Sequence, residues 1–138
     1  MDCKLTVTEF ELDHGDTIQV RGKTLPYPNE FCVNLGEDSD NLVLRFNSRF
    51  DNHKDTSTII CMSKRDGVWE KEERITDFPF NQSRKLKFSC TFSPYEILVQ
   101  LADNPNTIFP KWLDMKNIKY IAVEGNVKIE ALRFLRLC

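Results

Sequence analysis

The sequence lacks the long apolar segments that would place it in or across a membrane. Its first ten residues contain neither an apolar stretch of secretory length nor a cleavage site with small residues, so we expect no signal peptide. The longest aliphatic runs, at 59–62 and 120–123, are far too short to span a bilayer. The expectation is a soluble chain, made in the cytosol, that does not insert into membranes.

There is also no excess of basic residues. The chain has 19 Lys and Arg against 21 Asp and Glu, which gives a formal net charge of −2. A protein dedicated to duplex DNA would be expected to carry a basic surplus. The balance therefore predicts no nucleic-acid partner.

Cysteine is too scattered to suggest a metal site. The five cysteines include no CxxC pair, and their odd number and wide spacing do not resemble a disulfide framework. We predict that Cys32, Cys61 and Cys90 act as small apolar residues within strands. Cys3 and Cys138 lie near the ends and are expected to be exposed, and the sequence leaves open whether they form disulfides.

Familiar catalytic motifs are missing too. There is no GxSxG segment, no glycine-rich phosphate loop and only two histidines. Glu72 and Glu73 are neighbours, so in a strand they point to opposite faces and could not flank one glycosidic bond. We predict no enzyme activity, no metal and no cofactor.

What the sequence does contain is β structure. The 138 residues fit one domain, 1–138, and ten Phe with only five Gly favour strands. Short alternating runs separated by polar turns predict an all-β sandwich of two antiparallel sheets. The predicted strands are 5–10, 17–21, 30–35, 42–47, 58–63, 69–74, 85–92, 96–101, 119–124 and 127–137. Residues 110–118 are expected to form one helical turn, with Trp112 and Met115 facing inward.

The segment NLVLRFNSRF at 41–50 makes a sharper prediction, because neighbouring side chains on a strand point to opposite sides. The inward set is Leu42, Leu44, Phe46 and Ser48, and the outward set is Val43, Arg45, Asn47 and Arg49. Farther along, Glu72 and Arg74 share a face, and Trp69 needs a bend in the strand to join them. Guanidinium forks, an amide, a carboxylate and an indole form a mixture suited to sugar hydroxyls and C–H faces.

In order and spacing, these segments resemble the galectins, the β-galactoside-binding lectins. The resemblance covers essentially the whole chain and rests on FCVNLG at 31–36, NLVLRFNSRF, STIICMSK at 57–64, WEKEER at 69–74, FPF at 78–80 and FPKWLDMKNIKYIAVEG at 109–125. It implies a jelly-roll carbohydrate-recognition domain (galectin/concanavalin-like) of the prototype, single-domain class.

The resemblance also implies a carbohydrate site. The family's His-x-Asn-x-Arg strand and Trp-x-x-Glu-x-Arg segment match five residues here, and a loop position that often contacts a second sugar matches a sixth: Asn47, Arg49, Trp69, Glu72, Arg74 and His53. Two positions depart from the family pattern. Arg45 stands where the family has the His, and Met62 stands where it has the Asn of the next strand.

These departures predict a divergent member with weakened or altered sugar specificity. Arg45 is always charged and only donates, so it cannot replace a neutral imidazole that accepts a hydrogen bond. Either it pairs with Glu72 and fills the site, or the surplus of cations accepts a sulfated or other anionic saccharide. The alternative is a structural or interaction protein on a galectin fold whose sugar site has decayed, with the polar residues forming a surface ion-pair network.

The expected partners are galactose-containing or other glycans on glycoproteins and glycolipids. Prototype relatives pair as two-fold dimers, and residues 4–10 and 127–137 are apolar enough at alternate positions for a homodimer through the terminal strands. The missing signal peptide predicts a cytoplasmic protein, and the resemblance leaves open its export to the extracellular space without a signal peptide. The preferred glycan and the biological process are not determined by the sequence.

Overall fold

The computed structural model describes residues 2–52, 55–76, 84–102, 107–110 and 113–136. The expectations for His53, residues 78–80, Trp112 and Cys138 concern positions outside this part of the chain. Within it, no helix has the length and apolar character needed to cross a membrane.

The described residues form eleven strands, and each of the ten predicted runs overlaps one of them. The strands are β1 (Cys3–Val7), β2 (Thr17–Thr24), β3 (Glu30–Asp38), β4 (Asn41–Asn52), β5 (Asp55–Arg65), β6 (Val68–Ile75), β7 (Lys85–Phe92), β8 (Glu96–Leu101), β9 (Thr107–Pro110), β10 (Tyr120–Gly125) and β11 (Val127–Leu135).

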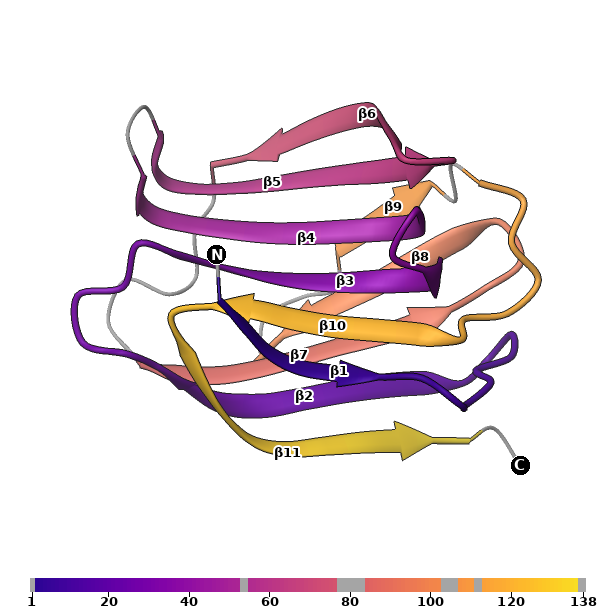
Figure 1. The fold of residues 1–138 in the computed structure, drawn as a ribbon, viewed down its shortest axis with the longest axis horizontal. Coiled ribbons are helices and arrows are strands. Elements are labelled where there is room, and N and C mark those ends of the chain that lie inside the picture. The colour runs from indigo at the N-terminus through magenta and orange to yellow at the C-terminus, as the bar shows by residue number, and fades with distance from the viewer. Residues whose placement is uncertain (1, 53–54, 77–83, 103–106, 111–112, 137–138) are drawn as a thin grey trace.

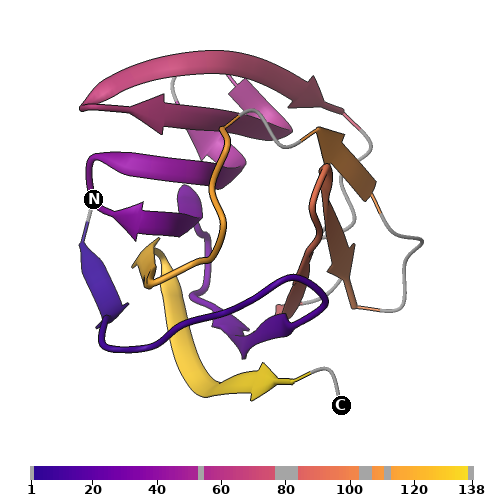
Figure 2. The ribbon, with the colours of Figure 1, turned by 90° about the vertical axis from the view of Figure 1, so that its right-hand side faces the viewer.

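The strands build two antiparallel sheets, as the alternation predicts. One sheet has six strands in the order β1-β10-β3-β4-β5-β6, and the other has five in the order β11-β2-β7-β8-β9. Figure 1 shows the two sheets one behind the other, and the turned view in Figure 2 shows them as two layers. The first and last strands, β1 and β11, each lie at a sheet edge.

The core lies between the two layers and consists of the inward set of each strand. Phe46 of β4 meets Phe88 of β7 across the layers, with ring centroids 5.2 Å apart, and both rings are buried. Burying a side chain of this size stabilises a fold by about 1.5–3 kcal/mol. Because Phe46 faces inward, its neighbours Arg45 and Asn47 must face outward.

The predicted facing of β4 is wrong at Val43. The strict alternation puts Val43 on the outer face, but it is fully buried and belongs to the core, as do Leu44 and Phe46. The cause is a β-bulge. Opposite β3, Leu35 pairs with Leu44 and the next residue, Gly36, pairs with Leu42, so one extra residue interrupts the period of two.

Two other expectations need correction. Strand β9 was not predicted from the sequence, since it is only four residues long and ends in Pro110, a residue that argues against strands. The predicted helical turn at 110–118 is wrong for its described part, because residues 113–118 adopt no helical conformation. Leu113 and Met115 are nevertheless buried, as alternate residues of an extended segment would be, so the inward facing of Met115 is confirmed.

The bulge between β3 and β4 depends on Gly36. A Cβ atom there would lie 2.0 Å from the carbonyl oxygen of Asn41 and 2.7 Å from the Cα of Leu42. Gly36→Ala is therefore expected to lower the free energy of unfolding by about 1–3 kcal/mol, as overpacking usually does. Urea unfolding followed by tryptophan fluorescence measures the change. The neighbouring exposed position supplies the control, Glu37→Ala, which should stay within about 0.5 kcal/mol of the parent. Equal stability of the two variants would contradict this account of the bulge.

Candidate functional site

Cross-strand register brings five of the predicted site residues onto the outer face of the six-stranded sheet. Asn47 of β4 lies opposite Ile60 of β5, which lies opposite Arg74 of β6. One step along, Arg45 lies opposite Met62, which lies opposite Glu72. Residues in one such row point to the same side of the sheet, about 4.8 Å from strand to strand.

Trp69 joins this face through the bend that the sequence requires. Met62 pairs with Glu72 but the next residue, Ser63, pairs with Glu70, which leaves Lys71 as an extra residue in β6. Lys71 has φ = 51°, the left-handed conformation in which a bulge residue re-aims the strand. Trp69 then lies opposite Lys64 with 42% of its surface exposed, so the indole is not sunk in the core.

Asn47 and Arg49 form a fixed polar unit at one end of this face. The Nδ2 of the buried Asn47 donates to Oε1 of Glu30 and to the carbonyl oxygen of Phe31, both at 3.1 Å. Its Oδ1 accepts a 2.8 Å hydrogen bond from Nε of Arg49. An amide with both ends occupied has one orientation, and it orients the guanidinium of Arg49 with it.

Arg45 does not pair with Glu72. Its Nη1 donates to Oδ1 of Asn34 at 3.1 Å and lies 3.6 Å from Oε1 of Glu124. Asn34 completes the triangle, because its Nδ2 donates to the same Glu124 oxygen at 2.7 Å. The side chains of Arg45 and Glu124 are only 22% and 24% exposed, so solvent screens this pair less than a surface ion pair. The sequence-based pairing with Glu72 is therefore wrong, and the carboxylate comes from β10.

Two cations contact the ring of Trp69. The Cζ of Arg45 lies 5.2 Å from the ring centroid, and the Nζ of Lys64 lies 4.8 Å from it. Lys64 also donates to the backbone oxygen of Ser39 at 3.1 Å. Cation–π contacts at partly exposed sites contribute about 0.5–1 kcal/mol, so a ligand that stacks on the indole competes with them.

Glu72 pairs with Arg74 on its own strand. Nε of Arg74 donates to Oε2 of Glu72 at 3.3 Å, and both side chains are 48% exposed. Two of the cations of this face thus have carboxylates beside them, Glu124 for Arg45 and Glu72 for Arg74. The face presents oriented donors and acceptors more than uncompensated positive charge.

Four residues of this face were not predicted from the sequence, namely Glu30, Asn34, Lys64 and Glu124. A signal for one of them was present, because in FCVNLG the residues Cys32 and Asn34 alternate with the core residues Phe31, Val33 and Leu35. Glu124 gives no local signal, since β10 reaches β3 only through the tertiary fold. His53 and its role lie outside the described residues.

A buried thiol lies beneath the polar face. Cys32 pairs in register with Asn47 and is fully buried, but unlike Cys61 and Cys90 it is not part of the core between the sheets. Burial raises the pKa of the Cys32 thiol to about 12, and Glu124 and Glu30 act in the same direction against Arg45. Burial also raises the pKa of the Cys90 thiol to about 12 and that of Cys61. All three are neutral thiols at physiological pH.

The arrangement is suited to reversible binding of a polar ligand. Asn47, Arg49, Glu72 and Arg74 supply donors and acceptors whose orientation is set before a ligand arrives, and the half-exposed indole supplies an apolar surface. Within the described ranges, no three His, Cys, Asp or Glu side chains lie close enough together to hold a metal ion.

Comparison with known proteins gives one consistent result. A family model described as galactoside-binding lectin matches residues 4–134. The chain is 41% identical to the 16 kDa beta-galactoside-binding lectin of Gallus gallus over 134 residues, which is 97% of this chain and 99% of that protein. It is 37% identical to galectin-1 of Sus scrofa over the same shares of both chains.

Solved structures agree. CG-16, a homodimeric agglutinin from chicken liver, matches with a TM-score of 0.89 and 42% identity, over 94% of this chain and 98% of that one. The complex of toad ovary galectin with thio-digalactose matches with a TM-score of 0.90 and 28% identity, over 97% and 99%.

Thiol reactivity tests the burial of Cys32. The thiolate is the reactive form, so iodoacetamide at pH 8 is expected to label Cys3, which is exposed, and to leave Cys32, Cys61 and Cys90 unlabelled until the protein unfolds. Peptide mass spectrometry gives the labelled fraction of each residue. Because unfolded thiols lose their protons near pH 9 while Cys32 and Cys90 hold theirs to about pH 12, the free energy of unfolding should fall across that interval. Labelling of native Cys32 as fast as Cys3 would contradict its position.

Proposed function

This chain belongs to the galectin family, the galactoside-binding lectins, and from that premise we propose that it binds β-galactosides on the outer face of its six-stranded sheet with an altered choice of sugar. Galectins are lectins, not enzymes, so the prediction that this chain is not an enzyme is confirmed by its family. The observation that carries the proposal is that Asn47, Arg49, Glu72 and Arg74 share one face with a half-exposed Trp69.

The proposed site consists of residues on β4, β5 and β6, with His53, which lies outside the described residues. They are Arg45, Asn47, Arg49, His53, Met62, Trp69, Glu72 and Arg74. In this proposal the oriented amide and guanidinium of Asn47 and Arg49 bond to sugar hydroxyls, and Trp69 packs on the apolar face of the ring. The ligands are galactose-containing glycans, as borne by glycoproteins and glycolipids. The sugar-bound toad ovary galectin, which has the same fold, supports this assignment.

Arg45 and Met62 are the reasons to expect an altered choice. The guanidinium of Arg45 is held by Asn34 and Glu124 and offers donors only. Met62 has a thioether, where an amide would bond to a further hydroxyl. A lost hydrogen bond between protein and ligand costs about 0.5–1.5 kcal/mol, so two losses weaken lactose binding by roughly 10- to 100-fold.

One observation favours the rival function, a structural or interaction protein whose sugar site has decayed. The ring of Trp69 already carries contacts from Arg45 and Lys64, which a sugar would have to displace. The two hypotheses differ in a simple measurement. Binding of lactose tighter than millimolar supports the lectin, whereas no signal from lactose or from any glycan of an array supports the decayed site.

The double variant Arg45→His with Met62→Asn tests the physical account. It removes one of the two cations from the indole, leaves Lys64 in place, and returns an acceptor and an amide, so lactose affinity should rise by roughly 10- to 100-fold. Isothermal titration calorimetry measures the affinity.

Arg133→His is the matched control, because Arg133 is an exposed cation on β11, in the other sheet. It should leave lactose affinity unchanged. If the double variant binds lactose no more tightly than the parent, Arg45 and Met62 are not the cause of weak binding. If the control gains as much affinity as the double variant, the gain is due to the change in net charge.

We further propose that the chain forms a two-fold homodimer through its terminal strands. Support comes from the edge positions of β1 and β11 and from Leu135, which is 47% exposed on β11. The related chicken liver agglutinin is homodimeric. A dimer would hold two sugar sites apart and cross-link glycans through avidity.

Leu135→Glu should weaken such a dimer, since it puts a charge into the apolar contact between edge strands. We expect the dissociation constant to rise tenfold or more, measured by sedimentation equilibrium. Ile108→Glu is the control, because Ile108 is 58% exposed on β9, the opposite edge of the same sheet. If only the Ile108 variant dissociates, the dimer uses the other edge and the proposal fails.

A further inference from the structure

The outer face of the five-stranded sheet carries a concentration of positive charge. In β2 and β7 the inward positions are core residues such as Val20, Leu86 and Phe88, so their neighbours point outward. Those neighbours, with residues of β11, form what we call the basic face: Arg21, Lys23, Lys85, Lys87, Lys128 and Arg133. The whole chain has a net charge of −2, so its positive charge is unevenly distributed.

Register places like charges directly opposite one another. Arg21 pairs with Lys87, and Lys23 lies between Lys128 on one side and Lys85 on the other. Like charges directly opposite on neighbouring strands destabilise a sheet. Such rows therefore lower the stability of the folded chain when no ligand is present. A bound anion would relieve the repulsion between the cations.

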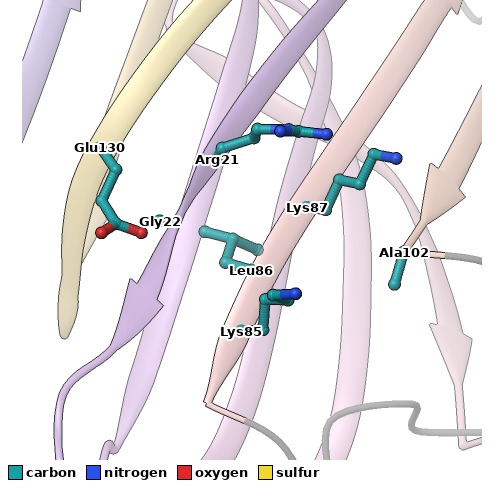
Figure 3. Close-up of a pocket in the computed structure, with 7 residues that line it drawn as sticks. All are labelled: Arg21, Gly22, Lys85, Leu86, Lys87, Ala102 and Glu130. Atoms are coloured by element: carbon teal, nitrogen blue, oxygen red, sulfur yellow. The ribbon is translucent and has the colours of Figure 1, made fainter.

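A cleft of about 270 Å³ lies within this face. Its lining includes Arg21, Lys85, Lys87 and Ala102, with Glu130 at the β11 side. Figure 3 shows the side chain of Arg21 extending from β2 toward the strand of Lys87, whereas Glu130 lies on the other side of Gly22. The Cβ of a larger residue at Gly22 would lie 2.1 Å from the backbone oxygen of Lys128, so only glycine permits this approach of β2 and β11.

Arg21, the central cation of the cleft, has no carboxylate partner in the part of the chain that the structure describes. The Nε of Arg21 is buried and has no hydrogen-bond acceptor, and among the described residues no carboxylate pairs with Arg21 or Lys87. The polar face of the other sheet differs, because Arg45 there has Glu124 and Arg74 has Glu72. If the chain takes an anionic group, the uncompensated charge of Arg21 and Lys87 favours the basic face.

The shape of the charge distribution indicates the kind of anion. Alternate residues along a strand are about 6.6 Å apart and neighbouring strands about 4.8 Å, so the cations form an extended array and not one compact socket. The outward residues of β2 and β7 beside it are uncharged and polar, and they hydrogen-bond in pairs, Thr17 with Thr91 and Gln19 with Ser89. Neither strand presents an outward aromatic ring on which a nucleobase could stack.

We propose that the basic face binds the sulfate groups of an acidic polysaccharide, with one sulfate in the cleft beside Arg21 and Lys87. Guanidinium forks match such oxyanions well, and the remaining lysines neutralise further sulfates along the chain. This second site is separate from the proposed galactoside site and does not depend on it.

The test is calorimetric titration with a sulfated octasaccharide cut from heparin. Arg21→Gln with Lys87→Gln should weaken binding roughly tenfold or more. The matched control is Lys116→Gln with Lys119→Gln, two exposed lysines away from the basic face, which should change binding less than twofold. Both pairs take the formal charge from −2 to −4 by removing two positive charges, so net charge alone cannot separate them.

Additional ligands, a stability measurement and a third variant test whether binding depends on sulfate and on the basic face. Desulfated octasaccharide should not bind, and saturating lactose should leave binding unchanged, because the two faces are on different sheets. The double variant should be no less stable to heat than the parent, since it removes a like-charge pair. Lys23→Gln, at an exposed position, should give a smaller loss of the same sign if the double variant does not fold.

The proposal is overturned if the parent does not bind the sulfated octasaccharide, or if both double variants lose affinity equally. Competition by lactose would put the anion on the other face and overturn it too. Tighter binding of single-stranded DNA of matched charge would assign the face to nucleic acid instead. Failure of lactose to bind at all would contradict only the galactoside proposal.

Discussion

The contact between Phe46 and Phe88 decides which side of β4 meets solvent. The two rings pack across the layers, and each belongs to a strand whose alternate residues are also in the core. Side chains on a strand alternate, so inward Phe46 makes Arg45 and Asn47 outward. A shift of one residue would expose the phenylalanine and bury a guanidinium, which costs far more than any outer contact contributes. The polar face therefore depends on the core, although none of its residues is part of it.

Two bulges adapt this regular pattern to the site. The one near Val43 adds a residue before Arg45, and the one at Lys71 adds a residue between Trp69 and Glu72. Without the second, the indole and the carboxylate would lie on opposite sides of β6, since they are three residues apart. The left-handed φ of Lys71 is thus the local conformation that allows an aromatic platform beside the polar row.

The outer faces of the two sheets differ in how their charged side chains are arranged. On the six-stranded sheet, Arg45 and Arg74 each have a carboxylate beside them, and Asn34 and Asn47 are hydrogen-bonded at both ends of their amides. Such a surface favours neutral, hydroxyl-rich ligands, because little charge has to be desolvated. On the five-stranded sheet, cations lie opposite cations, which suits ligands that bring their own negative charge.

Alternation and turn chemistry were enough to predict two antiparallel sheets, the inward facing of Leu44 and Phe46, and the outward facing of Arg45, Asn47 and Arg49. These properties depend on residues next to one another in the chain, and a period of two can be read directly. The carboxylate beside Arg45 could not be predicted, because Glu124 reaches it only when β10 pairs with β3. The same holds for Val43, for β9 and for the rows of opposed cations. Register between distant strands is set by the packing of the whole sandwich, and no local pattern encodes it.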